Sequence, residues 1–389
     1  MKLTLALPSL NRFADESVPA LALPAFNRLL RYGILRKETL RPSQFYGRHL
    51  WSGSLITQVQ RLRHTSPNRT AAFASPVWQQ MGMHHVNIIS GEFIGIQKEE
   101  AQRLCADLSA FYQDKDWQFE PLCESMWLLS MPKIEDWGAE CVLDVCGQLE
   151  MDGQAHGKDA VSWLAMQTEI QMFLHTHPIN QAREQQGLPE INGLWLWNDA
   201  DGTQSADIVT SDSTWARFSD TPKLDAPYDL KAWFEMVQET GNTVSDGLIF
   251  LDDLVSTLQT GDVWAYKDIL ESWETRWFAP LWDALASDHL KTVCIATDGE
   301  NGGTLEIGRR SKWAFWRKAK TFNGSWEAVL SLQRLQFGRN SVPYILQRNR
   351  FQQTCRIVGI DTVEVRQFGI IAGINDFGLF GIRTPFIHP

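Results

Sequence analysis

The segment from His175 to Asn192 carries the side chains best suited to bind a small ligand. Arginine grips a carboxylate or phosphate through two hydrogen bonds, and asparagine amides and a neutral imidazole supply further hydrogen bonds. An anion-binding corner would be formed by His177, Asn180, Arg183 and Asn192. The same segment also fits a structural role, in which Pro178 ends a helix, Asn180 caps the next turn and Arg183 pairs with a nearby acid. The residue types alone leave both interpretations open.

Two histidines of this segment, His175 and His177, form an HxH pair of the kind that chelates zinc. A zinc site needs at least a third protein ligand. His156 is isolated, however, and His84 and His85 belong to a different element of the chain. The spacing therefore disfavours a zinc site.

Three aspartates that follow apolar runs form a second set of candidate groups. Asp252 and Asp253 follow GLIFL, and Asp298 follows TVCIAT. Open α/β sheets bind their ligands at the carboxyl ends of the strands. Carboxylate oxygens are ligands that suit Mg²⁺ or Mn²⁺. The three acids therefore fit either the remnant of a cation site or helix caps and solvated strand ends, and no other cofactor is expected.

The elements that would position these groups alternate between strands and helices. A strand in MKLTLAL precedes a helix over residues 21–33, with Pro24 in its first turn and Gly33 at its end. Beyond residue 190 the alternation resumes, with strands in GLWLWN, DGLIFLDDL and LKTVCIATDG and helices between them. This pattern predicts an α/β fold, with a parallel sheet flanked by helices.

A segment with a different order of predicted strands and helices interrupts this pattern. HHVNIIS and SMWLLSM have the composition of strands, QKEEAQRLCADLSAFYQ that of an amphipathic helix, and residues 159–177 that of a long helix. The sequence therefore predicts a smaller α+β domain inserted into the α/β core. The expected domains are a discontinuous core of residues 1–74 and 191–327, an insertion of residues 75–190, and a C-terminal extension of unknown structure, residues 328–389.

Composition excludes several classes of partner. The net charge is −10, and no run of Lys and Arg offers a surface for nucleic acid. No apolar stretch reaches the roughly 18 to 20 residues that span a membrane, and six scattered cysteines without a CxxC pair fit a reducing cytosol. We expect a soluble, cytoplasmic protein. Residues 331–389 hold seven Arg, no Lys and three acids, which is a net charge of +4 and leaves −14 on the rest of the chain. This change of composition marks a domain boundary.

The order of these motifs resembles that of the cofactor-independent phosphoglycerate mutases of archaeal type, in the alkaline phosphatase superfamily. The resemblance is carried by His177, Pro178, Ile179, Asn180, Arg183, Gly187, Pro189 and Asn192, and by Trp197 after the next strand. ASPVWQQMGMHHVNI also resembles the start of that family's insertion domain. The chain further resembles a proteobacterial branch of the superfamily, the RpfE-type regulatory or phosphoglycerate-mutase-like proteins. The resemblance covers residues 1–327 and implies an alkaline-phosphatase-like core with an inserted domain.

The resemblance implies a phosphotransferase in which Asp and His ligands hold two divalent ions that activate a Ser or Thr nucleophile. This chain departs from that pattern at each ligand cluster. Its first strand ends in ALPSLN, without an acid, and Gln259 and Gly299 stand near the positions where histidines are expected. Ser52 and Ser54 lie near the expected nucleophile position, but without a recognisable flanking motif.

We therefore expect a phosphoglycerate-mutase-like protein with a degenerate metal site. It would be non-catalytic and would bind a small anionic ligand or a protein partner in a regulatory role. One alternative is an active metal-dependent phosphomutase or phosphatase with substituted ligands. The other is a protein-interaction scaffold whose acidic surface and Trp-rich faces bind a partner protein.

Overall fold

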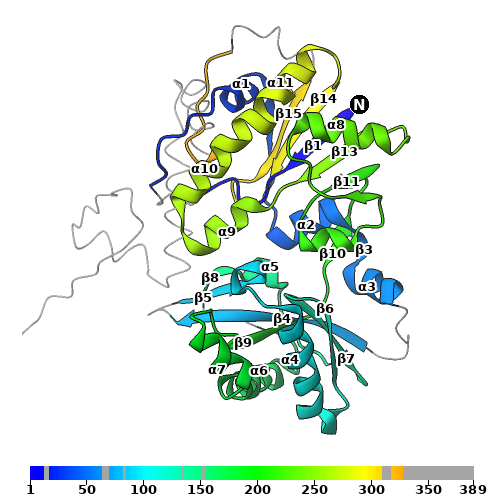
Figure 1. The fold of residues 1–389 in the computed structure, drawn as a ribbon, viewed down its shortest axis with the longest axis vertical. Helices are drawn as coiled ribbons and strands as arrows, with labels where there is room; N and C mark the ends of the chain where they lie inside the picture. Colours follow the sequence, from blue (N-terminus) through cyan, green and yellow to red (C-terminus); the bar gives the residue numbers. More distant parts are fainter. Residues whose placement is uncertain are drawn as a thin grey trace, which may run out of the picture. The chain divides into compact units, whose positions relative to one another are not determined.

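The structure is a computed structural model (Figure 1). It describes residues 1–12, 17–63, 70–81, 85–133, 135–150, 155–308 and 317–326. All of these residues belong to one compact unit, Met1–Leu330. The predicted C-terminal extension, residues 328–389, lies outside the described residues.

The larger sheet has seven strands in the order β12-β11-β13-β1-β14-β15-β2. Its strands are β1 (Lys2–Ala6), β2 (Ile34–Lys37), β11 (Ile208–Thr210), β12 (Lys223–Leu224), β13 (Asp246–Phe250), β14 (Thr292–Thr297) and β15 (Gly303–Gly308). β1 pairs in parallel with β13 and β14, and β11 pairs in parallel with β12 and β13. β15 pairs antiparallel with both β14 and β2. The predicted α/β class, with a sheet of mainly parallel strands, is confirmed.

Helices pack against this sheet and bury its apolar side chains. They are α1 (Pro24–Tyr32), α8 (Leu230–Glu239), α9 (Asp253–Thr260), α10 (Val263–Trp273), the π-helical turn η4 (Glu274–Phe278) and α11 (Ala279–Ala286). The predicted helix with Pro24 in its first turn is therefore confirmed as α1. The backbone N–H groups of Ala25 and Phe26 at its start donate to the buried carboxylate of Glu274. A carboxylate at this end satisfies helix N–H groups that lack a partner within the helix.

A second part of the core, next to this sheet, is built from α2 (Pro42–Leu50), α3 (Leu55–Arg63), and the antiparallel pair β3 (Ser52–Ser54) and β10 (Asp201–Thr203). Gly202 is required at the centre of this pair. A Cβ at this position would lie 2.1 Å from the carbonyl oxygen of Trp51 and 2.7 Å from that of Gly47. The glycine therefore lets α2 and β10 approach each other closely.

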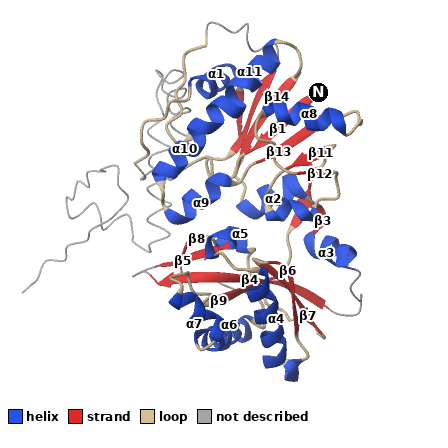
Figure 2. Cartoon of the chain, in the orientation of Figure 1, coloured by secondary structure: helices blue, strands red, loops and turns tan. Residues whose placement is uncertain are grey.

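The smaller lobe, residues 70–197, contains the second large sheet (Figure 2). Its strands are β4 (Thr70–Met81), β5 (His85–Ser90), β6 (Gln118–Cys123), β7 (Met126–Met131), β8 (Gly147–Glu150) and β9 (Gly193–Trp197), all paired antiparallel. Its helices are α4 (Lys98–Phe111), α5 (Val142–Val145), α6 (Ala160–His175) and α7 (Pro178–Gln185), with short turns η1 (Gly91–Ile94) and η2 (Gln113–Lys115). α4, α6 and α7 lie on one side of the sheet. The predicted strands in HHVNIIS and SMWLLSM correspond to β5 and β7.

β9 differs in its placement from the sequence analysis, which assigned GLWLWN to the core. It is a strand, but it pairs with β4 of the smaller lobe, with Trp197 opposite Phe73. All five of its residues are buried. A continuous apolar run of this kind is typical of a strand that is covered on both faces. Such a strand could belong to either the larger or the smaller sheet, so its sequence does not predict which one it joins.

One apolar cluster extends from the smaller lobe into the core. It joins Trp197 and Phe73 of the smaller sheet to Tyr46 of α2 and Phe250 of β13. Trp215, in the turn η3 (Thr214–Phe218), has its ring 6.1 Å from Trp197 and 6.0 Å from Tyr46. The rings of Phe73 and Trp197 stack at 4.3 Å. No helix in the described part of the chain is both long and apolar enough to span a bilayer.

Candidate functional site: an acidic, aromatic cleft

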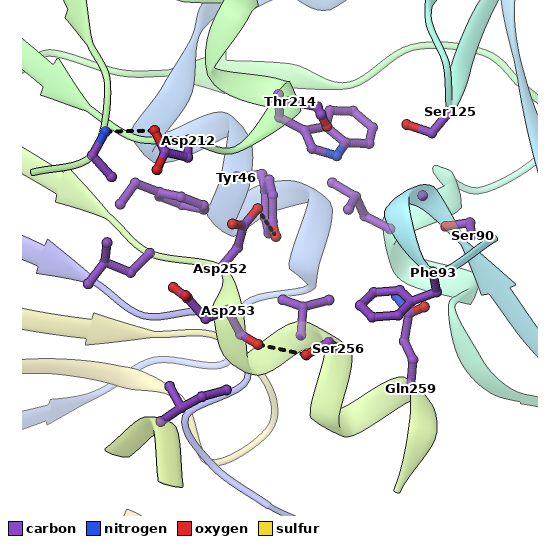
Figure 3. A pocket seen from close by; sticks show the side chains of 18 of the residues that line it. Tyr46, Ser90, Phe93, Ser125, Asp212, Thr214, Asp252, Asp253, Ser256 and Gln259 are labelled. Atoms are coloured by element: carbon purple, nitrogen blue, oxygen red, sulfur yellow. Dashed lines mark hydrogen bonds between the residues drawn. The ribbon is translucent and has the colours of Figure 1, made fainter. Parts of the chain in front are cut away.

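A cavity of about 780 Å³ lies between the carboxyl ends of β11 and β13 and the smaller lobe (Figure 3). From the core, α2, the segment after β11, and α9 contribute to its wall. From the smaller lobe, Ser90, Phe93 and Ser125 line it, together with the start of α5. A concave site of this size at the carboxyl edge of parallel strands is the common position for a small-molecule site in α/β proteins.

Three carboxylates line this cleft. Asp252 and Asp253 follow β13 and begin α9, and Asp212 follows β11. These strands are parallel neighbours, so their carboxyl ends bring the three acids to the same edge. The hydroxyl of Tyr46 donates to Asp252 at 3.4 Å, and a carboxylate oxygen of Asp212 accepts from the backbone N–H of Ala226 at 2.8 Å. Asp212 was not recognisable from the sequence, because a three-residue strand leaves only a weak pattern.

One arginine, Arg276 of η4, is part of the same wall. Its guanidinium lies over the ring of Tyr228, 4.4 Å from the centroid, and its Nε donates to the Tyr228 carbonyl at 2.6 Å. Aromatic side chains also line the cavity: Tyr46, Phe93, Trp215, Tyr228, Phe250 and Trp273. The described cleft wall therefore combines apolar rings with three carboxylates and one cation.

Burial at the cleft raises the pKa of two of its groups, Asp253 and Tyr46. Desolvation raises the pKa of Asp253, and the negative charge of Asp212 acts in the same direction, while a backbone hydrogen bond and Arg276 oppose this rise. Burial raises the pKa of Tyr46 well above its ordinary value, and the charges of Asp252 and Asp298 add to that shift. Tyr46 therefore remains protonated near neutral pH and acts as a hydrogen-bond donor to Asp252.

Asp298 lies apart from the cleft wall. It follows β14, is 6% exposed, and accepts the backbone N–H of Ser9 at 2.7 Å and the Thr297 hydroxyl at 3.5 Å. Burial raises its pKa. Ser9, in the turn that follows β1, has a positive φ of 61°. In the sequence analysis Asp298 was grouped with the cleft acids, whereas here it closes the turn that follows β1.

The expected cation site does not form as a cluster of three ligands. Among the described residues, no three His, Cys, Asp or Glu side chains are grouped so that they could hold a metal ion. Asp252 and Asp253 share the cleft, while Asp298 is engaged by the backbone of Ser9. The described cleft wall contains no histidine. The residues present therefore do not fit the two metal ions that the sequence resemblance implies.

The predicted anion-binding corner is occupied by protein atoms. Arg183 is 1% exposed, and its Nε donates to the Pro189 carbonyl at 2.8 Å. One terminal nitrogen donates to Glu100 at 2.8 Å and to the Gly95 carbonyl at 3.5 Å, and the other donates to the Ile94 carbonyl. Each nitrogen of the guanidinium thus has a partner within the smaller lobe, and Arg183 ties α7 to the segment before α4.

The other three residues of the corner also bind the chain itself. Asn180 donates to the carbonyls of Leu174 and Ile191 and accepts from the Ile191 N–H, each at 2.8 Å. Asn192 accepts from the backbone N–H of Gln79 at 2.7 Å and donates to its carbonyl at 2.9 Å. His177 caps α7 by accepting from Ile179, and its other ring nitrogen lies 3.2 Å from Asp107. These contacts support the structural interpretation of the segment.

The two serines near the expected nucleophile position are engaged in local structure. Ser52 donates to the carbonyl of Gln204 at 2.9 Å. Ser54 donates to Asp199 at 2.5 Å and accepts from the backbone N–H of Thr57 at 3.1 Å, which satisfies a donor at the start of α3. Both hydroxyls thus stabilise the junction around β3.

Asp144 connects the two lobes beside the cleft. It belongs to α5 and accepts the backbone N–H of Ser43 at 2.8 Å and its hydroxyl at 2.6 Å, at the start of α2. Desolvation raises the pKa of Asp144 and Glu140 acts in the same direction, whereas the hydrogen bonds from Ser43 and the charge of Arg41 oppose it. The folded protein therefore binds this proton more tightly than the unfolded chain.

We expect the free energy of unfolding of the wild type to rise relative to that of Asp144→Asn as the pH falls. Because the folded pKa is raised, the ionised carboxylate reduces stability at neutral pH, and this cost disappears as the pH falls through that pKa toward 3.8, the ordinary value. Urea unfolding at a series of pH values measures the difference. Asp225→Asn, at a carboxylate that is 90% exposed, is the control and should show no such trend. A fall in the stability of the wild type relative to Asp144→Asn on acidification would contradict the prediction.

Comparisons with known proteins yield distant similarities. No protein-family model matches the chain, and no curated protein matches it. Among solved structures, the chain is similar to a cofactor-independent phosphoglycerate mutase from Thermoplasma acidophilum DSM 1728, with 15% identity, a TM-score of 0.37, and coverage of 79% of this chain and 89% of that one. It is also similar to the PH0037 protein from Pyrococcus horikoshii, with 13% identity, a TM-score of 0.44, and coverage of 79% and 87%. At these scores, the fold and site described above rest on this chain's own contacts.

Proposed function

We propose that this protein binds a small molecule in the cleft between its lobes and performs no two-metal phosphoryl transfer, acting in a regulatory role. The observation that carries the proposal is the composition of the cleft wall. It has the volume and the aromatic surface of a small-molecule site. Among the described residues of the wall, the acids are not accompanied by the histidines that a two-ion phosphotransferase of the resembling family would need.

The charge of the cleft revises the expected ligand. The sequence analysis expected a small anionic ligand at the corner around Arg183, but that guanidinium is buried among protein acceptors. The cleft wall itself has three carboxylates and one arginine. A phosphate or carboxylate ligand would be repelled there, because like charges at short range in a partly desolvated site interact unfavourably. We therefore place a ligand that is not anionic in the cleft.

A library of uncharged, cationic and anionic metabolites tests this proposal, with binding followed by intrinsic tryptophan fluorescence and by thermal unfolding. Ser256 lines the cleft, so Ser256→Trp should fill part of the cavity and abolish the response of a ligand that binds there. Ser162→Trp, on an exposed position of α6, is the matched control. We expect at least one non-anionic compound whose response is lost in the first variant and kept in the second.

The catalytic alternative has its own test. With Mn²⁺ or Mg²⁺ and p-nitrophenyl phosphate, we expect no release of p-nitrophenol above that of a control lacking protein. If turnover occurred and were lost in both Asp252→Asn and Asp298→Asn, the protein would be an active metal-dependent phosphatase with substituted ligands. The proposal of a non-catalytic binding protein would then fail.

A further inference from the structure

The cleft wall pairs carboxylates with aromatic rings, and this combination recognises organic cations. A cation over the face of an aromatic ring is attracted by the ring's quadrupole, most strongly where water is excluded. One ring of the wall already does this within the protein, because the guanidinium of Arg276 lies 4.4 Å from the centroid of Tyr228. Phe93 and Trp215 offer further rings in the same cavity.

The charges of the wall are unbalanced. Asp212, Asp252 and Asp253 face the cavity from the ends of two neighbouring strands, and Figure 3 shows all three around the same space. Arg276 partly offsets them, but it also donates to the carbonyl of Tyr228. Desolvation is the main cause of the raised pKa of Asp253, and the negative charge of Asp212 adds to it. A positive charge held between these groups would relieve the repulsion between the carboxylates.

The chemistry of that positive charge follows from the groups around the cavity. Carboxylates accept hydrogen bonds from the N–H groups of an ammonium ion, and the rings of Phe93 and Trp215 can lie along methylene groups. A compact metal ion fits less well, because no group of three metal-ligating side chains is present in the described residues.

We infer that the cleft binds an alkylammonium compound, held by carboxylates at its charged nitrogens and by aromatic rings along its methylene chain. This inference rests on the proposed function and specifies its ligand class. The cavity of about 780 Å³ accommodates a molecule with more than one ammonium group.

Three probes of matched length test this inference. Spermidine is cationic, 1,8-octanediol is neutral and suberate is anionic, so the series varies charge at nearly constant size. Each is titrated into the full-length protein, followed by tryptophan fluorescence and calorimetry. We expect saturable binding of spermidine, and binding of the other two at least tenfold weaker. Ser256→Trp should abolish the spermidine signal.

Acid substitutions separate a specific site from general attraction to an acidic protein. Asp252→Asn combined with Asp253→Asn should weaken spermidine binding at least tenfold, while Asp114→Asn combined with Glu99→Gln removes two exposed acids of the smaller lobe and should leave it unchanged. Equal weakening by both pairs would overturn the inference. Tighter binding of octanediol that is lost in Ser256→Trp would also overturn the inference, yet support the proposed function. Tighter binding of suberate that is lost in Ser256→Trp would overturn both the inference and the non-anionic ligand of the proposed function. If neither the three probes nor any library compound showed binding that Ser256→Trp abolishes, both the inference and the proposed function would fail.

Discussion

Replacing Arg183 with alanine is expected to lower the free energy of unfolding by about 3–5 kcal/mol, the usual cost of removing one partner of a buried ion pair. The side chain is 1% exposed and donates to Glu100 and to the carbonyls of Pro189, Gly95 and Ile94. Alanine would leave these acceptors without their donor, and it would leave a cavity between α7 and the segment before α4.

Urea unfolding followed by circular dichroism measures this loss. Arg103→Ala is the matched control, because its side chain is 68% exposed and its ion pair with Asp107 belongs to the class of surface pairs worth about 0–1 kcal/mol. We expect the control to unfold within that range of the wild type. If Arg183→Ala had wild-type stability, the guanidinium would be free to serve a ligand, and the structural role assigned to the corner would be wrong.

Replacing Trp197 with alanine is expected to cost about 3–5 kcal/mol, as for other large-to-small changes at buried aromatic positions. Trp197 is fully buried in β9, stacks on Phe73 at 4.3 Å, and donates its ring N–H to the hydroxyl of Ser75 at 3.0 Å. Its other neighbour is Trp215 of the cleft wall. The change should therefore weaken the smaller sheet and also alter the surface that a ligand meets.

Thermal and urea unfolding measure the loss, and Trp264→Ala is the control. Trp264 is 65% exposed at the start of α10, so its removal should change stability by less than about 1 kcal/mol. Trp197→Phe should fall between the two, because it keeps a ring against Phe73 but loses the hydrogen bond to Ser75. Equal stability of the two alanine variants would show that β9 is not part of the apolar cluster shared by the lobes.

The periodic parts of the sequence determined the α/β class. β1, β13 and β14 are recognisable because they are short apolar runs bounded by polar turns, and α1 because its apolar residues recur at helical spacing after Pro24. The position of Asp252 and Asp253 at a strand end was also predictable, since a parallel strand and the helix after it place such residues at the carboxyl edge. These are local features, and local sequence carries them.

Tertiary structure alone decided which partners the polar groups meet. The same arginine and asparagines fit either a ligand corner or a set of internal contacts, and only the fold brings Gly95, Glu100 and Ile191 to them. Likewise, only the fold directs the backbone of Ser9 to Asp298 and adds Asp212 to the cleft acids. A side chain's type states which bonds it can make, but its partner is set by contacts between residues that are distant in the sequence.

Sheet membership was undetermined for the same reason. β9 is apolar on both faces, so its sequence specifies a buried strand but not the sheet that buries it. Its pairing with β4, and the stacking of Trp197 on Phe73, come from packing between segments more than a hundred residues apart. Hydrophobic burial has no direction of its own, and the shape of the packed core therefore selects one arrangement among those that the sequence permits.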